Sequence, residues 1–243
     1  AGFSSATVVG ATSTVTAPPP PIPVMGTAGP DTLSQAVFAR LSGLDGDDVL
    51  TGGDLADTLS GGAGADSLVS GGGNDNVSGG DGADTIVDTG GSNYLRGDAG
   101  DDRITGGDGF DDINGNTGDD VASGGLGNDW VVGGKDNDLL FGDGGNDLVY
   151  GNLGADTCEG GAGNDTVRGG QDNDVVRGGD GDDFLSGDRG NDTMTGGAGA
   201  DIFSTFAETG IDRVTDFSVA DGDRVQLAPG TQYTVAQVGG DTV

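Results

Sequence analysis

Aspartate recurs in this sequence at a fixed interval of nine residues, and no other feature of the chain offers as much chemistry. From Gly43 to Ser204 the chain consists of eighteen consecutive copies of one nine-residue pattern (18 × 9 = 162 residues), of which residues 61–69 are a clean copy. If each copy is numbered from its first residue, position 6 is Asp in every copy except the one with Asn93, and positions 1 and 4 are mostly Gly. Carboxylates and glycine-rich backbone present the hard oxygen ligands that Ca²⁺ prefers. The spacing therefore predicts a series of calcium sites.

The elements that position these aspartates are indicated by position 8, which is apolar in all eighteen copies. One apolar residue in nine cannot form the apolar face of a helix, and it predicts a three-residue strand around position 8 followed by a six-residue turn. Two copies then make one coil, with position 8 inside and the aspartates along two edges. The predicted fold is all-β, a right-handed parallel β-roll (β-solenoid) of about nine coils and about 43 Å in length.

Alternate copies share an edge, so the expected metal ligands fall into two series. One edge carries Asp48, Asp66, Asp84, Asp102, Asp120, Asp138, Asp156, Asp174 and Asp192. The other carries Asp57, Asp75, Asp111, Asp129, Asp147, Asp165, Asp183 and Asp201, and an outlying copy adds Asp31. Nine loops on each edge enclose eight gaps, which gives up to about sixteen inter-loop sites. Asn93 is expected to weaken the two sites that it shares with Asp75 and Asp111; the alternative is a neutral, drifted copy.

The pattern resembles the nonapeptide repeat G-G-x-G-x-D-x-U-x of RTX (haemolysin-type) proteins, over two-thirds of the chain. The resemblance implies a parallel β-roll in which Ca²⁺ is held between loops one full coil apart. Each ion would take aspartate and backbone carbonyl oxygens from two consecutive loops on the same edge. The resemblance also implies a protein that is secreted by a Gram-negative bacterium, through type I export with an uncleaved C-terminal signal.

The flanking segments divide the rest of the chain. Residues 1–24 are interpreted as a strand-like arm (3–16) with a Pro-rich spacer, although a disordered tail is the alternative, and residues 25–42 as degenerate copies that cap the roll. Residues 43–204 are the roll itself. Residues 205–243 are similar to the small β cap that follows the roll in exported metalloproteases, with strands over its end and further strands within 233–243.

Composition limits the possible partners. The chain has 9 basic and 41 acidic residues and a formal net charge of −32, which excludes nucleic acid as a direct partner. No apolar run is long enough to predict a transmembrane segment, and the start of the chain lacks a signal-peptide pattern. Cys158 falls on position 8 and is expected to be a core residue. One small apolar residue in nine is a thin core for a chain this acidic, so we expect it to fold only with bound metal.

The absence of histidine excludes three kinds of catalytic site: Ser-His-Asp, Cys-His and H-E-x-x-H. The chain is therefore predicted to be non-enzymatic.

Side chains at positions 7 and 9 should point outward, and in the middle of the roll they are apolar. A candidate interface is therefore formed by Trp130, Val132, Leu139, Phe141, Leu148 and Tyr150. Two main functions remain. One is a calcium-folded structural protein that self-assembles into an extracellular filament or surface layer, and the other is the calcium-triggered folding and export module of a larger secreted enzyme or toxin. A plain calcium store or adhesive matrix protein is a third option.

Overall fold

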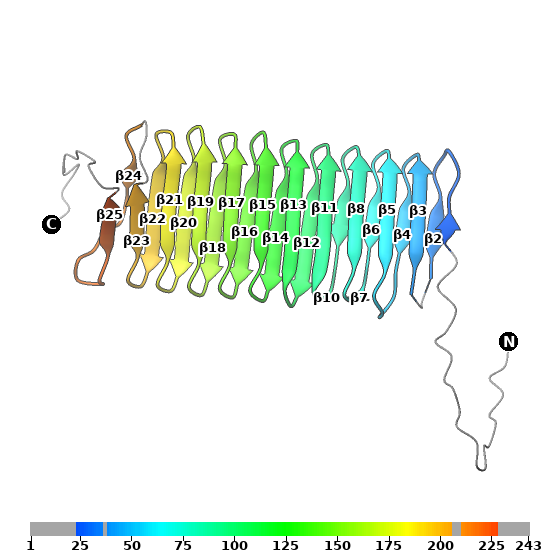
Figure 1. The fold of residues 1–243 in the computed structure, drawn as a ribbon, viewed down its shortest axis with the longest axis horizontal. Helices are drawn as coiled ribbons and strands as arrows, with labels where there is room; N and C mark the ends of the chain where they lie inside the picture. Colours follow the sequence, from blue (N-terminus) through cyan, green and yellow to red (C-terminus); the bar gives the residue numbers. More distant parts are fainter. Residues whose placement is uncertain (1–22, 36–37, 206–209, 228–243) are drawn as a thin grey trace, which may run out of the picture.

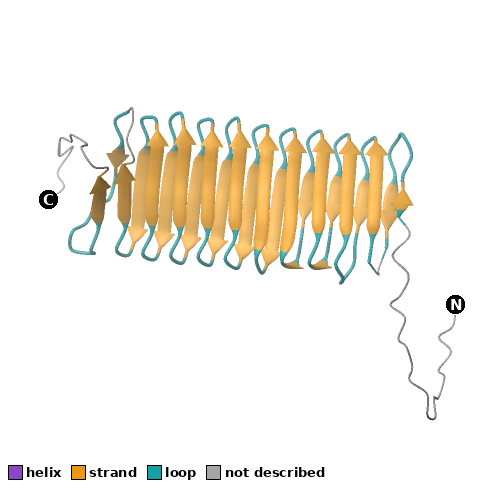
Figure 2. Cartoon of the chain, in the orientation of Figure 1, coloured by secondary structure: helices purple, strands orange, loops and turns teal. Residues whose placement is uncertain are grey.

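Strands from alternate copies of the repeat stack into two long parallel sheets that face each other (Figure 1). The computed structural model describes residues 23–35, 38–205 and 210–227. Within them the secondary structure consists of strands joined by short loops along two edges, as Figure 2 shows. The part of the chain that the structure describes contains no helix long and apolar enough to cross a membrane.

Twelve strands form the first sheet. In spatial order they are β1 (Val24–Met25), β3 (Arg40–Asp45), β5 (Thr58–Ala63), β8 (Asn76–Asp81), β11 (Asn93–Ala99), β13 (Asp111–Thr117), β15 (Trp130–Lys135), β17 (Leu148–Leu153), β19 (Thr166–Gln171), β21 (Phe184–Arg189), β23 (Ile202–Thr205) and β25 (Arg224–Leu227).

Eleven strands form the second sheet. They are β2 (Thr32–Ser34), β4 (Val49–Thr51), β6 (Ser67–Val69), β9 (Thr85–Val87), β12 (Arg103–Asp108), β14 (Val121–Leu126), β16 (Leu139–Gly144), β18 (Thr157–Ala162), β20 (Val175–Asp180), β22 (Thr193–Ala198) and β24 (Arg213–Val214). A separate two-stranded sheet joins β7 (Gly72–Gly73) and β10 (Gly90–Gly91).

The register of the strands follows the repeat. Leu59 pairs with Val77 and Val77 with Leu95, so neighbouring strands in a sheet lie two copies, or 18 residues, apart. This pairing confirms the predicted parallel β-solenoid with two copies in each coil. The solenoid has about eleven turns, because flanking strands add to each sheet at both ends. β1 and β25 are the edge strands of the first sheet, and β2 and β24 are those of the second. Residues 1–22, which include the expected arm, and the strands expected within 233–243 lie outside the described residues.

Most strands are longer than the three residues that the repeat predicts. β5 spans six residues, because the pairing continues past the apolar position to Gly62↔Gly80 and Ala63↔Asp81. Gly62 has a φ of 125°, a conformation open to glycine, and it turns the backbone without breaking the ladder. The prediction of a six-residue turn was therefore wrong for most copies, although β4, β6 and β9 do have three residues.

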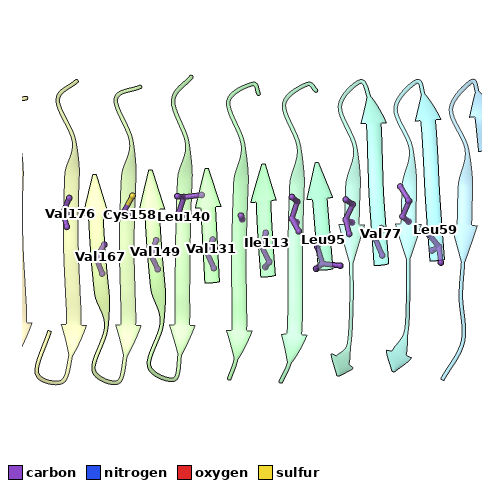
Figure 3. Packing of buried hydrophobic residues seen from close by; sticks show 14 of the residues in the cluster. Leu59, Val77, Leu95, Ile113, Val131, Leu140, Val149, Cys158, Val167 and Val176 are labelled. Atoms are coloured by element: carbon purple, nitrogen blue, oxygen red, sulfur yellow. The ribbon is translucent and has the colours of Figure 1, made fainter. Parts of the chain in front are cut away.

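The core is the row of position 8 side chains, and it confirms the predicted assignment. All eighteen of them are buried, with exposed fractions of 0–2%. Figure 3 shows part of this core as two files between the sheets. Leu59, Val77, Leu95, Ile113, Val131, Val149 and Val167 come from the first sheet, and Leu140, Cys158 and Val176 from the second. Cys158 is buried in this core and carries a free thiol.

Side chains at positions 7 and 9 are exposed or half-buried in the described copies, except for Ser186 and Ser204 at position 9, which are buried. Trp130 and Leu148 are 42% and 39% exposed and are direct neighbours in the first sheet. Val132 and Tyr150 pair in the same two strands and are half-buried. Leu139 and Phe141, also half-buried, belong to β16 in the second sheet. The candidate interface residues are thus divided between two faces, as the alternation of copies predicts.

Candidate metal centres

Most loops place a glycine and an aspartate opposite one another at their base. In β5, Gly61 is the last buried residue, and Asp66 lies directly before the next strand, β6. Asp66 is only 3% exposed, and the other position 6 aspartates are buried to a similar degree. A carboxylate in this position is removed from bulk water, so its two oxygens need partners within the loops.

One oxygen of each carboxylate has a fixed partner. The backbone N–H of Asp48 donates to Oδ1 of Asp66 at 2.8 Å, and the N–H of Asp66 donates to Oδ1 of Asp84 at 2.8 Å. The same bond recurs along both edges and links every coil to the next. We call this row of bonds the inner ladder. It holds each carboxylate in one orientation, with Oδ2 turned toward the base of its own loop.

The other oxygen has no partner in most loops. Oδ2 is buried and without a hydrogen bond in sixteen position 6 aspartates: Asp48, Asp66, Asp75, Asp84, Asp102, Asp111, Asp120, Asp129, Asp138, Asp147, Asp156, Asp165, Asp174, Asp183, Asp192 and Asp201. An unpaired buried carboxylate oxygen is costly, and its regular recurrence indicates a ligand that the protein atoms do not supply.

Position 1 leaves room for that ligand. A Cβ atom built on Gly61 would overlap with Oδ2 of Asp66 and would lie 2.6 Å from the carbonyl oxygen of Gly79, one coil further on. The missing side chain thus opens a small space bounded by a carboxylate oxygen of one loop and a carbonyl oxygen of the next. The same arrangement recurs at Gly79 and Gly178.

These residues fit Ca²⁺. The space is lined by carboxylate and carbonyl oxygens, which are hard ligands, and the unpaired Oδ2 atoms supply the negative charge. Position 6 aspartates and position 1 carbonyls of consecutive loops would hold the ion, and the ion would supply the positive charge that the buried carboxylates lack. No group of three or more His, Cys, Asp or Glu side chains converges among the described residues, so each aspartate acts with backbone oxygens rather than in a side-chain cluster.

The electrostatics of the protein atoms alone oppose ionisation. Burial, together with repulsion from neighbouring aspartates, raises the pKa of Asp138 and of Asp174 to about 8, although the inner-ladder bond acts in the opposite direction. The same causes raise the pKa to about 7 in Asp84, Asp102, Asp147 and Asp183. A cation in the loops would reverse this tendency, because an adjacent positive charge favours the carboxylate form.

Position 5 has a role that the repeat pattern alone does not predict. Oδ1 of Asp47 accepts the N–H of Ala65 at 2.9 Å, and Oδ1 of Asn146 accepts that of Asn164 at 2.7 Å. These bonds form an outer ladder at the loop tips, which runs in the opposite direction to the inner one. The alternation of Asp, Asn and Ala at position 5 was the available signal, since the Asp and Asn side chains readily hydrogen-bond to backbone groups.

Two predicted ligands differ from the rest. Oδ2 of Asp57 accepts the N–H of Gly53 at 2.7 Å, and Oδ2 of Asp31 accepts both the N–H and the hydroxyl of Thr27. Their carboxylates are therefore already satisfied within their own loops, near the N-terminal end of the solenoid.

Two further aspartates continue the inner ladder beyond the counted copies. Oδ1 of Asp212 accepts the N–H of Asp192 at 3.3 Å, and Oδ1 of Asp223 accepts that of Asp201 at 3.0 Å. These residues are 20 and 22 positions from their partners, whereas two copies of the repeat span 18, so the nine-residue period does not identify them. The signal that could have found them is the triplet Asp-Arg-Val at 212–214 and 223–225, which has the Asp-x-apolar form of each repeat.

The comparisons with known proteins agree with this geometry. A family model described as the RTX calcium-binding nonapeptide repeat (4 copies) matches eight overlapping segments: residues 42–77, 51–86, 78–113, 87–122, 105–140, 123–158, 132–167 and 168–203. Together they cover residues 42–203, or 162 of the 243 residues. No curated protein matches the chain. The chain belongs to the family of RTX calcium-binding nonapeptide-repeat proteins, which bind Ca²⁺ through aspartate-rich turns and are typically secreted by Gram-negative bacteria.

Proposed function

We propose that this chain is a non-enzymatic structural protein of the extracellular space or cell surface, whose calcium-folded β-roll self-assembles into a filament or surface layer. The observation that supports assembly is the exposed apolar pair on the first sheet. Trp130 and Leu148 lie side by side there. Tyr94, which is 46% exposed, lies two coils away from Trp130, with Asp112 between them. Exposed apolar clusters on a flat, regular surface are typical of contact surfaces.

The two ends of the solenoid support a head-to-tail arrangement. Within the described residues, β25 pairs only with β23, and at the opposite end β1 pairs only with β3. All the strands are parallel, so one molecule placed end to end on another would continue both sheets. A strand edge is a template for a further strand, and a contact of this kind produces open fibres when its rotation does not close. In our proposal, residues 3–16 of one subunit complete the C-terminal sheet edge of the next.

The alternative function is a calcium-triggered folding and export module of a larger secreted enzyme or toxin. It is favoured by the buried carboxylates, because a chain whose folded state places unpaired charges in its loops should remain unfolded until calcium is present. Both functions require calcium-dependent folding, and they differ in whether the folded chain associates with itself.

Electron microscopy of the purified chain in millimolar calcium, repeated after addition of a chelator, tests the proposal. We expect ordered filaments or sheets that dissolve on chelation. The double variant Trp130→Ser/Leu148→Ser should reduce assembly strongly, whereas Thr166→Ser, on the same row of the first sheet, should leave it unchanged. Deletion of residues 1–16 should shorten or abolish the polymers. Monodisperse rods in calcium would exclude self-assembly and would support the export module.

A further inference from the structure

Three departures from the repeat occur together on one edge of the solenoid. Position 1, usually glycine, is Ser70 in one copy and Asp88 in the copy one coil further on, and the copy with Asp88 also contains Asn93. All three side chains are buried, with exposed fractions of 1–3%. The loop that lacks the position 6 carboxylate is thus the loop that has gained a carboxylate at position 1.

The Asp88 carboxylate points into the space at the loop base. Its Oδ2 accepts a hydrogen bond from the Ser70 hydroxyl, and its Oδ1 accepts the N–H of Gly90 at 2.7 Å. It also faces Asp75, because position 1 of a copy lies against Oδ2 of the aspartate in the same copy, as Gly61 does against Asp66, and Ser70 and Asp75 belong to one copy. After burial, repulsion from Asp88 helps to raise the pKa of Asp75. Oδ2 of Asp75 is buried and has no hydrogen-bond partner. Two carboxylates and a hydroxyl therefore meet in one buried place.

Asn93 retains only half of the usual role of position 6. Its Oδ1 accepts the N–H of Asp75 at 2.9 Å and so maintains the inner ladder. Its Nδ2 donates to Oδ1 of Asp111 at 2.8 Å. An amide nitrogen is a donor and cannot bind a cation. The negative charge that Asn93 lacks is present at Asp88, on the side of the loop that faces Asp75.

The backbone of these two loops differs from that of most of the other loops. Preceding strands β6 and β9 end at Val69 and Val87, and the loops then form the separate pair β7–β10, with Gly72 opposite Gly90. Elsewhere in the solenoid, most strands run on without a break into the loop. The interruption falls directly at Ser70 and Asp88, although β4 ends in the same way at Thr51, before Gly52. The separate pair β7–β10 joins these two loops one coil apart.

We propose that Ser70, Asp75 and Asp88 form a variant cation site for Ca²⁺, in which Asp88 replaces the carboxylate that Asn93 lacks. The two carboxylates and the hydroxyl are hard oxygen ligands, and a divalent ion matches two negative charges. The missing negative charge of Asn93 then weakens only the calcium site between the loops of Asn93 and Asp111. The site between the loops of Asp75 and Asn93 retains its ion. This inference rests on the calcium-dependent folding of the chain proposed above.

Native mass spectrometry of the full chain in calcium tests the site by counting bound ions. We expect Asp88→Asn to bind one ion fewer than the wild type. The control is Asp54→Asn, which removes the same charge from an exposed loop position on the same edge and should leave the count unchanged. The double variant Asp88→Asn/Asn93→Asp, which returns the carboxylate to position 6, should restore the count.

The outcomes separate the inference from the function on which it rests. An Asp88→Asn protein that folds and keeps the wild-type count would overturn the variant site, since the Asp75–Asp88 pair would then be neutralised by a proton. A wild-type chain that binds no calcium would overturn the calcium-dependent function itself. If Asp88→Asn fails to fold, the double variant decides: restored folding with the wild-type count supports the site, and restored folding with one ion fewer contradicts it.

Discussion

In sixteen of the position 6 aspartates, the two carboxylate oxygens have different roles. In Asp66, Oδ1 accepts a backbone N–H of the preceding coil, and Oδ2 faces the open space beside Gly61 without a partner. The first oxygen accepts a structural hydrogen bond with or without metal. The second oxygen, buried and unpaired, destabilises the folded state until a cation binds to it. We therefore expect the calcium dependence of folding to originate in this second oxygen, which is unpartnered in sixteen of the copies.

The raised pKa values lead to a prediction for the calcium-free chain. An Asp whose pKa is raised from 3.8 to about 7 or 8 in the folded state, such as Asp84 or Asp138, binds a proton more tightly folded than unfolded. Its contribution to stability is complete below pH 3.8 and is lost as the pH rises through 7 to 8. Without calcium we therefore expect more β-structure at about pH 5 than at pH 8. Circular dichroism in calcium-stripped buffer measures this, and equal β-content at both values would contradict it.

In calcium the sign reverses, because protons then compete with the ion for Oδ2. The calcium concentration at the midpoint of folding should rise as the pH falls from 8 to 6. A midpoint that stays constant over this range would show that the buried carboxylates do not bind the ion. A titration followed by circular dichroism at each pH provides the measurement.

Position 1 should be intolerant of even a methyl group. In Gly61→Ala the new Cβ would overlap with Oδ2 of Asp66 and lie 2.6 Å from the carbonyl oxygen of Gly79. We expect a loss of about 1–3 kcal/mol from overpacking, and a higher calcium requirement for folding. Gly72→Ala is the matched control, since its Cβ would have no neighbour closer than 3.9 Å. Calcium titrations of both variants check this, and equal midpoints would contradict the role of position 1.

At the scale of the element, each coil is a thin layer that contributes two core residues. Ile113, for example, is fully buried and is followed in its file by Val131. A layer this small cannot fold alone, so its stability comes from neighbouring coils, as in other solenoids. Damage to one layer should then affect the adjacent coils most.

Truncation of a core side chain tests this coupling. Ile113→Ala should lower the free energy of unfolding by about 2–5 kcal/mol, and Ile113→Val by about 0.5–1.5 kcal/mol. Val49→Ala, at a position that is 42% exposed, should cost about 0.5 kcal/mol or less. Urea denaturation in saturating calcium gives these values. Hydrogen exchange should show the loss of protection centred on β11, β13 and β15, and uniform loss along the solenoid would contradict the layered model.

The repeat predicts most of the fold because its period specifies which side chains are inside. The nine-residue period predicts the apolar residues at position 8 and the edge on which each aspartate lies. It does not predict the six-residue strands, because the glycines that extend β5 past Ser60 are typical of turns. The pairing of Gly62 with Gly80 depends instead on the neighbouring coil. Asp212 and Asp223 were missed for a related reason: their spacing is irregular, and only the tertiary ladder identifies them.

At the scale of the whole molecule, the net charge of −32 is concentrated along the two loop edges. In the folded solenoid, successive position 6 carboxylates are held in line, one per coil, along each edge. Without counter-charge this arrangement opposes the compact state. We therefore expect calcium to stabilise the folded chain both at individual loops and through the overall charge distribution.

The size of the chain in solution should change accordingly. A fully unfolded chain of 243 residues has a radius of gyration of about 54 Å, and the folded solenoid should be less than half as large. Small-angle X-ray scattering should show this compaction when calcium is added, while the same ionic strength of sodium chloride should not produce it. Compaction by sodium chloride alone would indicate that screening is sufficient and that specific calcium sites are not needed.

The two-copy coil also constrains how such a chain can change in length. Duplication of one nine-residue copy would preserve every loop, every aspartate and every core residue, yet it would transfer all downstream side chains to the opposite sheet. If the duplicated copy lies between Tyr94 and Trp130, then Trp130 and Leu148 separate from Tyr94 and move to the sheet that carries Leu139 in the present chain. The interior tolerates insertions and deletions in units of nine, but the pattern of the outer surface survives only those in units of eighteen. A lineage selected for its surface should therefore vary in length by pairs of copies, and one selected only for metal binding by single copies.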